Sequence, residues 1–258
     1  MIVIAIANQK GGVGKTTSAI NIATAMAASG WRTLLVDLDP QGNASTGVGL
    51  GASQRDMSSY DLLVDDVPLA ECVTRTNIPG LDLVPATVDL SGAEIELVSV
   101  EGRTDRLRRA FANHTAHDVC FIDCPPSLGL LTLNALCAAD TLLVPLQCEF
   151  FALEGLSQLL QTVEQVQQRF NPDLGIIGIA LTMFDRRNRL TDQVADDVRE
   201  CLGNLVFEAV IPRNVRLSEA PSHGLPALVY DHACTGSKAY MDLAKELIGR
   251  LPKQKVAA

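Results

Sequence analysis

The feature that most limits the fold of this chain is a glycine-rich segment lying between an apolar run at 2–7 and a helix-like stretch at 16–29. Glycines let backbone N–H groups turn towards an anion without a Cβ atom in the way, and a helix N-terminus adds partial positive charge. The strand–loop–helix context predicts a phosphate-binding loop, and it disfavours a glycine-rich turn of purely structural use. The residues expected to bind the phosphates are Lys10, Gly11, Gly12, Val13, Gly14, Lys15, Thr16 and Thr17.

Within this loop, two side chains have expected roles. Lys15 can reach the β- and γ-phosphates of a nucleotide, and the Thr16 hydroxyl can ligate Mg²⁺. Lys10 is a second lysine in the same loop, and it has no evident role there once Lys15 is placed.

Short apolar runs alternate with helix-like stretches along the whole chain. The runs are nearly continuous in Val, Ile and Leu, as in parallel strands covered on both faces, and they span 2–7, 33–38, 81–85, 119–123, 141–146, 176–183 and 205–211. Stretches with an apolar period near 3.6 span 16–29, 151–170, 192–202 and 234–251. The alternation predicts an α/β fold with a doubly wound, mainly parallel sheet and helices on both faces. We expect region 42–80 to form short helices and loops.

Length and charge limit the organisation of the protein. The chain has 258 residues, of which 47% are hydrophobic, and this favours a single domain over 1–258 with a frayed tail at 252–258. Residues 1–185 carry 10 Lys and Arg against 21 Asp and Glu, a net −11, whereas 186–258 carry 11 against 9, a net +2. A total of −9 argues against a surface coated with nucleic acid, but it permits a local anion-binding patch in the C-terminal quarter.

Two features indicate a cytoplasmic protein with no membrane partner. The first seven residues are apolar without a basic leader, which predicts a buried strand rather than a signal peptide, and no stretch reaches the ~18 apolar residues of a membrane span. The seven cysteines form no CxxC pair and are expected to be reduced. Cys120 and Cys124 flank Asp123, so a metal site there is the alternative to small buried side chains.

Two acidic motifs follow apolar runs. Asp37 and Asp39 end the run at 33–38, and Asp123 ends the run at 119–123. Carboxyl ends of adjacent parallel strands converge on a ligand, so these side chains are expected beside the phosphate loop. Asp39 could orient or deprotonate an attacking water, and Asp123 could be held towards Mg²⁺. The alternative for Asp39, and more so for Asp37, is a cap on the next segment.

These motifs together resemble the deviant Walker A ATPases, the group that contains ParA, Soj and MinD. The matching segments are KGGVGKTT at 10–17, VDLDPQGN at 36–43 and FIDCPPS at 121–127, and the ParA/Soj branch is resembled further at 181–190 and 211–224. The resemblance implies an ATPase that uses ATP and Mg²⁺ and forms a homodimer with two nucleotides at its interface. It also implies that the dimer binds double-stranded DNA without sequence preference. A ParB-like centromere-binding protein would stimulate hydrolysis and release it, so the protein would associate with the nucleoid.

The resemblance also implies roles for single residues. Lys10 matches the lysine that reaches the partner's phosphates, and Gly11 matches a glycine near the dimer interface. Asp39 matches the residue required for hydrolysis, and Pro212 lies in the segment that resembles the adenine-contacting loop. Lys10, Lys15 and Asp39 are therefore the expected catalytic residues.

Arginines gather in two loops of the C-terminal quarter, at 186–189 and 213–216. The guanidinium group is planar and always charged, which suits phosphate. Arg187 and Arg216 match positions where the ParA/Soj branch carries DNA-contacting arginines, and Arg189 is expected to join them; solvated loop arginine is the alternative. No aromatic residues interleave with them, so binding should be phosphate-directed and dependent on salt.

Three other classes share the phosphate loop. A MinD-like membrane-associated ATPase would need a C-terminal amphipathic helix with an exposed apolar face, but Leu243, Leu247 and Leu251 are expected to pack on the domain. An iron–sulfur reductase would need paired interface cysteines, and Cys124 has no convincing partner. A small-molecule kinase or metabolic ligase would need a lid or a second substrate pocket, and no obvious one is present.

Overall fold

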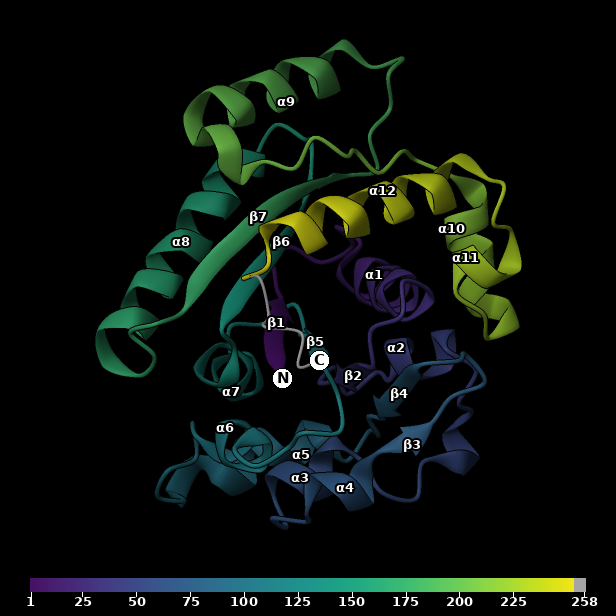
Figure 1. The fold of residues 1–258 in the computed structure, drawn as a ribbon. Coiled ribbons are helices and arrows are strands. Elements are labelled where there is room, and N and C mark those ends of the chain that lie inside the picture. The colour runs from purple at the N-terminus through teal and green to yellow at the C-terminus, as the bar shows by residue number, and fades with distance from the viewer. Residues whose placement is uncertain (253–258) are drawn as a thin grey trace.

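A seven-stranded sheet forms the centre of the protein (Figure 1). This computed structural model describes residues 1–252, so the tail expected at 252–258 lies, apart from Pro252, outside the described residues. The strands are β1 (Ile2–Ile6), β2 (Thr33–Asp37), β3 (Thr74–Arg75), β4 (Leu81–Val84), β5 (Val119–Asp123), β6 (Thr141–Gln147) and β7 (Gly175–Thr182). Their order is β3-β4-β2-β5-β1-β6-β7; β3 pairs antiparallel with β4, and the other neighbours pair in parallel. The predicted doubly wound, mainly parallel sheet is confirmed.

Helices cover both faces of this sheet (Figure 1). They are α1 (Lys15–Ala28), α2 (Asn43–Gly47), α3 (Ser59–Leu63), α4 (Leu69–Cys72), α5 (Leu90–Glu96), α6 (Arg106–Phe111), α7 (Leu130–Ala138), α8 (Ala152–Arg169), α9 (Arg189–Leu202), α10 (Val215–Glu219), α11 (Ala227–Tyr230) and α12 (Thr235–Arg250). Short 3₁₀ helices span Ala52–Gln54, Leu97–Ser99, Gly203–Leu205 and Ala220–His223. Region 42–80 forms short helices and loops as predicted, together with the short edge strand β3.

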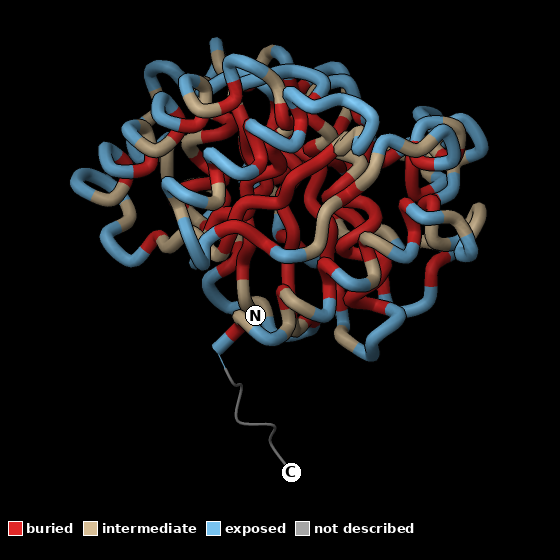
Figure 2. Tube along the Cα trace, turned by 90° about the horizontal axis from the view of Figure 1, so that it is seen from above, coloured by how far each residue is buried: buried red, intermediate tan, exposed pale blue. Residues whose placement is uncertain are grey.

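The sheet separates two apolar cores, because successive strand residues point to opposite faces. On β1, Val3 and Ala5 enter the core shared with α7 and α8, whereas Ile4 and Ile6 enter the core shared with α1 and α12. Figure 2 shows the buried residues gathered along the sheet and the exposed ones on the outer helices and loops. With both faces covered, the strands need apolar residues at every position, which explains their unbroken runs.

The prediction of a strand at 205–211 is wrong. The segment begins in the 3₁₀ helix Gly203–Leu205, and its neighbourhood makes only isolated bridges to β7 and its following loop, at Ile179 with Val206 and Phe184 with Pro212, within the described residues. The other six predicted strands are present, with ends that differ by no more than one residue.

Arg250, at the end of α12, explains why this segment does not join the sheet. Its guanidinium donates to the carbonyl oxygens of Ile177, Leu205 and Val206 at 3.0 to 3.2 Å and lies 3.9 Å from the centre of the Phe207 ring. These carbonyl groups are therefore satisfied by a side chain rather than by a β-ladder. Phe207 packs against Gly178, where a Cβ atom would lie 2.4 Å from its ring, so the close approach depends on glycine.

Helix α12 packs on α1, the helix that begins at the glycine-rich loop. A buried hydrogen bond of 3.0 Å joins the Ser18 and Tyr240 hydroxyls, and burial raises the pKa of Tyr240. Ser18 lies two residues after Thr16 on α1. Its bond to Tyr240 therefore holds the C-terminal helix beside the candidate nucleotide site.

Replacing Tyr240 with phenylalanine should lower the free energy of unfolding by about 1–2 kcal/mol, because the buried Ser18 hydroxyl loses its partner. Tyr60→Phe is the matched control, since the Tyr60 hydroxyl bonds Glu96 at an exposed site and its removal should change stability little. Urea unfolding of both variants measures the difference. Equal losses would contradict the role of the Ser18–Tyr240 bond in packing α12.

Candidate nucleotide site and arginine loops

The candidate site lies at the carboxyl edge of the three central strands. Asp123 ends β5 and is in register with Ile6 of β1 and with Asp37 of β2. The glycine-rich loop follows β1, and Asp39 follows β2. The sheet register therefore brings the loop and the acidic motifs together, as the sequence predicted.

The loop has the backbone shape that an anion cradle requires. Gly12 and Gly14 have φ values of 75° and 87°, in the left-handed region that favours glycine, and Gly14 is the N-cap of α1. A Cβ atom built on Gly11 or Gly12 would meet nothing within 4 Å, so the space beside both residues is open. Val13 is buried, and its carbonyl accepts a 2.8 Å bond from the Thr182 hydroxyl of β7, which anchors the loop.

Lys15 lies at the base of the loop. Its side chain is buried, and Nζ donates a 3.0 Å bond to the Lys10 carbonyl. Burial lowers the pKa of Lys15, and the nearby Asp123 carboxylate partly opposes that change. Thr16 and Thr17 are half-buried in the next turn of α1. A desolvated ammonium at a helix N-terminus gains from a bound phosphate.

Asp123 is fully buried, and neither of its carboxylate oxygens has a hydrogen-bond partner among the described residues. Burial raises the pKa of Asp123 well above its usual range, and Asp37 raises it further. Thr16 and Lys15 act in the opposite direction; the Thr16 hydroxyl lies near enough to favour the charged form without meeting hydrogen-bond geometry. A pair of unpartnered buried oxygens beside a threonine hydroxyl fits Mg²⁺, which prefers oxygen ligands.

The two acidic residues that follow β2 have different surroundings. Asp37 is fully buried and accepts bonds from the Ser45 N–H at 2.8 Å, the Ser45 hydroxyl at 2.7 Å and the Asp39 N–H at 3.2 Å. Burial is the main reason that its pKa rises to about 6. Asp37 thus anchors α2, which favours the capping alternative for this residue. Asp39 is half-buried, and one of its oxygens accepts from the Gln41 N–H.

A cavity of about 520 Å³ adjoins the loop on the α1–α12 side. Pro212, the residue predicted to contact the adenine base, is one of its lining residues. Other lining residues, which the sequence analysis missed, are Thr182, Met183, Asn214, Val215, Leu217, Ser218 and Tyr240. Met183 has a φ of 50°, unusual outside glycine, directly after β7. The apolar run at 176–183 indicated a strand but gave no sign that its end would border a ligand cavity.

Lys10 lies at the exposed rim of the site. Its Nζ forms an ion pair with Glu149, and both side chains are about half exposed. The neighbouring Phe150 and Phe151 are 75% and 64% exposed and meet edge to face. Sequence reasoning missed Glu149 and both phenylalanines, although an exposed Phe-Phe pair directly after an apolar strand is a signal that could have drawn attention to them.

The two arginine loops lie side by side. The Phe184 N–H donates to the Ile211 carbonyl, and the Arg213 N–H donates to the Phe184 carbonyl, each at 3.0 Å. Arg187 is 87% exposed and pairs with Asp185 at 2.8 Å, and hydrogen bonds from Arg187 lower the pKa of Asp185 to about 2. Arg189 is exposed at the first position of α9. Backbone hydrogen bonds therefore join the segment that leads to Arg187 with the segment that leads to Arg216.

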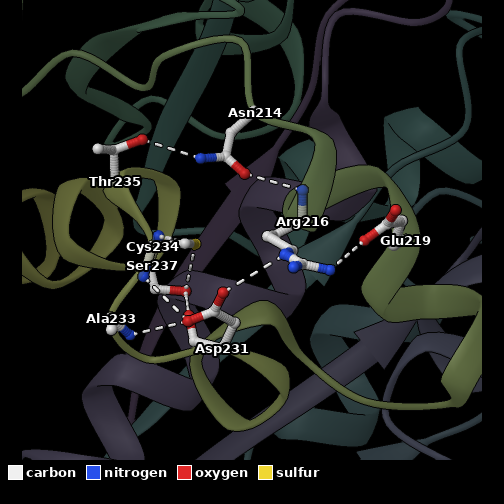
Figure 3. Close-up of polar contacts among 8 residues, drawn as sticks. All are labelled: Asn214, Arg216, Glu219, Asp231, Ala233, Cys234, Thr235 and Ser237. Carbon is white, nitrogen blue, oxygen red and sulfur yellow. Dashed lines mark hydrogen bonds and ion pairs between the residues drawn. The ribbon is translucent and has the colours of Figure 1, made fainter.

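Arg216, on α10, is held by acidic neighbours (Figure 3). Its Nη1 donates to Glu219 at 2.9 Å, and its Nε lies 3.5 Å from Asp231. These carboxylates raise the pKa of Arg216, Glu219 most through its hydrogen bond. The side chain remains 51% exposed, so a phosphate can reach it.

Cys124 is buried beside Asp123, and burial raises the pKa of its thiol. Among residues 1–252, no group of three or more His, Cys, Asp and Glu side chains is placed to hold a metal ion. Across the same part of the chain, none of the helices has both the length and the apolar character of a bilayer span.

An open glycine loop at a helix N-terminus, facing a buried lysine and a buried carboxylate on an adjacent strand, defines the class of P-loop nucleotide-binding ATPases. Residues 1–176 match a family described as an AAA domain. The chain is 57% identical to the chromosome partitioning protein ParA of Caulobacter vibrioides over 251 residues, covering 96% of this chain and 94% of that one. It is 52% identical to the sporulation initiation inhibitor protein Soj of Bacillus subtilis, covering 95% and 97%.

A solved structure described as cobyrinic acid a,c-diamide synthase from Mycobacterium smegmatis, with bound ATP analogue and magnesium, is 40% identical with a TM-score of 0.83, covering 96% of this chain and 94% of that one. The chain belongs to the ParA/Soj family of P-loop ATPases. It is an ATPase, with ATP and Mg²⁺ as its cofactors.

Asp123→Asn should leave the protein without nucleotide as stable as the wild type or more so, because a neutral amide replaces a buried, unpartnered carboxylate. At a hundred times Kd, ATP with magnesium should stabilise the wild type by about 2.7 kcal/mol in total, and the variant should lose the part of this stabilisation that depends on magnesium. Thermal melts with ATP in the presence of magnesium or EDTA measure both effects. A variant that loses stability on its own yet keeps the magnesium effect would contradict the assignment.

Proposed function

We propose that this chain is a chromosome-partitioning ATPase acting as one ATPase domain. It forms an ATP-bound homodimer that holds double-stranded DNA without sequence preference and releases it when a ParB-like centromere-binding protein stimulates hydrolysis. The observation that carries the proposal is the position of Lys10. Its ammonium lies at the exposed rim beside Glu149, while Lys15 already occupies the base of the loop, so Lys10 is available to a second protomer.

Within one protomer, the residues have distinct roles. The phosphates would be bound by the N–H groups of Gly11, Gly12, Val13, Gly14 and Thr17, and the base would lie beside Pro212. Lys15 would neutralise the β- and γ-phosphates, and Thr16 and Asp123 would hold Mg²⁺, which would supply positive charge to the phosphate oxygens. Asp39 orients the attacking water or accepts its proton, and its half-exposed carboxylate is consistent with access to solvent.

Exposed apolar side chains support the dimer. Val88 follows β4, Leu128 follows β5, and Phe150 and Phe151 follow β6, so all four belong to loops at the carboxyl edge that carries the phosphate loop. Large exposed apolar residues at one edge are typical of an interface. A second copy would cover them and bring its Lys10 to the first protomer's phosphates, so γ-phosphate binding and dimerisation would be coupled.

DNA retention would rest on Arg187, Arg189 and Arg216. Arg187 precedes α9, Arg189 begins it and Arg216 lies on α10, and the segments that lead into these two helices are hydrogen-bonded to each other in a protein whose total charge is −9. One such patch gives weak binding, whereas two patches in a dimer neutralise twice as many DNA phosphates, and affinity rises steeply with that number. This dependence of affinity on the number of neutralised phosphates explains how an acidic protein could associate with the nucleoid only in its ATP form.

A MinD-like membrane-associated ATPase is the second candidate, and the C-terminal helix disfavours it. Leu243, Ala244 and Leu247 of α12 are buried against the core that contains α1, as expected from the sequence. A metabolic ligase, suggested by the name of the Mycobacterium smegmatis protein, has less support, because that identity is 40% against 57% and 52% for ParA and Soj.

Lys10→Ala should weaken the ATP-dependent dimer at least about tenfold, because the contact across the interface is charge-assisted. Sedimentation velocity with magnesium and a non-hydrolysable ATP analogue measures the dimer fraction. Lys245→Ala removes an exposed lysine of α12 that pairs with Asp242, and it should leave the dimer fraction unchanged. A dimer fraction in the Lys10 variant equal to that of the wild type would refute the trans role.

Arg187→Glu combined with Arg216→Glu should reduce DNA retention in the ATP state by about a hundredfold or more at low salt, because phosphate contacts become repulsive. Nucleotide affinity should stay within about twofold. Arg75→Glu with Arg169→Glu makes the same change of charge at exposed positions on β3 and α8, and it should reduce retention far less. Filter binding to a duplex of arbitrary sequence measures the effect of both pairs of substitutions. If the wild-type protein does not bind DNA at saturating nucleotide, the proposed function is wrong.

A further inference from the structure

Arg216 is paired with two carboxylates from different parts of the chain (Figure 3). Glu219 lies one turn further along α10 and accepts from Nη1 at 2.9 Å. Asp231, which follows α11, lies 3.5 Å from Nε. The guanidinium also lies 6.0 Å from the centre of the Tyr230 ring. The arginine expected to contact DNA phosphate is thus already paired within its own protomer.

Asp231 is a fixed partner rather than a mobile one. Its second carboxylate oxygen accepts from the N–H groups of Ala233 and Cys234, each at 3.1 Å, and its carbonyl accepts a 2.8 Å bond from the Ser237 hydroxyl. These bonds join Asp231 to the first turn of α12. Movement of α10 away from the start of α12 therefore separates Arg216 from Asp231.

The other side of α10 borders the candidate nucleotide cavity. Val215, Leu217 and Ser218 line that cavity. Thr17 of the phosphate loop and Tyr240 of α12 line it as well. Helix α10 therefore borders the ligand on one side and carries Arg216 on another.

Asn214 connects these parts at the start of α10. Its side-chain oxygen accepts from the Arg216 N–H, and its amide donates to the Thr235 hydroxyl of α12, each at 2.8 Å. The position of α10 relative to α12 is thus set by a few polar contacts beside the cavity.

We propose that Glu219 and Asp231 are internal counter-charges that hold Arg216 back from DNA, and that a nucleotide in the cavity releases it by shifting α10 relative to α12. The inference rests on the proposed DNA-binding function and adds a regulatory device to it. A DNA phosphate must displace both carboxylates to bind Arg216, and it is repelled by them if they stay. Because the pairs are partly exposed, the exchange changes affinity by a modest factor.

Glu219→Gln with Asp231→Asn tests the proposal, since both changes remove charge and keep shape, and an asparagine oxygen can still accept from Ala233 and Cys234. Without nucleotide, the Kd for a 24-base-pair duplex should fall about three- to tenfold. With a non-hydrolysable ATP analogue it should change less, so the ratio of the two affinities should shrink. Glu219→Gln alone should give part of this gain without touching the start of α12. Asp242→Asn is the matched control for Glu219→Gln, because it also removes one negative charge from an i,i+3 pair. It should change Kd by less than about twofold.

The background variant Arg216→Ala distinguishes a specific release from a general change of charge. In that background, the gain from the two substitutions should vanish; a gain of equal size would overturn the proposal. A wild type that retains DNA with the analogue, but whose affinity without nucleotide is unchanged by the two substitutions, would also overturn it while leaving the proposed function intact. If the wild type and the double variant both fail to bind DNA in any nucleotide state, the proposed function itself fails.

Discussion

Buried charges at the carboxyl edge of the sheet are the constraint on which the rest of the structure depends. Lys15 lies at the base of the glycine-rich loop, and Asp37 and Asp123 lie opposite each other on adjacent strands. Taking these groups out of water is costly, and the attraction between Lys15 and Asp123 offsets only part of the cost, as the raised pKa of Asp123 indicates. Such an edge is completed by ligands of both signs, a phosphate for the lysine and a divalent cation for the carboxylate.

The core on the α1 side joins this edge to the C-terminal part of the chain. Helix α1 begins at the phosphate loop, Ser18 bonds Tyr240 of α12, and the start of α12 holds Asp231 beside Arg216. Each step is a direct contact between neighbouring elements. Nucleotide and Arg216 therefore need not communicate through the sheet, because one helical layer borders the nucleotide cavity and carries Arg216.

The sequence was sufficient wherever one local rule decides the structure. Unbroken Val, Ile and Leu runs marked the six strands that are covered on both faces, and the spacing of glycines around Lys15 marked the phosphate loop. It failed at 205–211, where the pattern suits a strand but Arg250, some forty residues later, takes the carbonyl groups that a ladder would use. The role of Asp37 was open for a similar reason, because Ser45 becomes its partner only once α2 is placed.

The ion pairs at the site could not be predicted. Lys10 with Glu149 and Arg216 with Asp231 join segments whose separation in space depends on the completed sheet and helix packing. Periodicity and motif spacing describe neighbours along the chain, and they carry no information on which exposed charge meets which.

Arg250 has a consequence that does not involve ligands. Strand β7 is an outer strand of the sheet, and the segment beside it forms no continuous ladder. Unpaired strand edges invite pairing with the strands of other molecules, and a charged side chain placed on the edge prevents it. By binding the carbonyl group of Ile177, the last turn of α12 removes one acceptor from this edge, and the N–H groups of Phe207 and Ile211 take the carbonyl groups of Ile179 and Leu181. The C-terminal helix thus helps to protect an exposed strand edge as well as to pack the core.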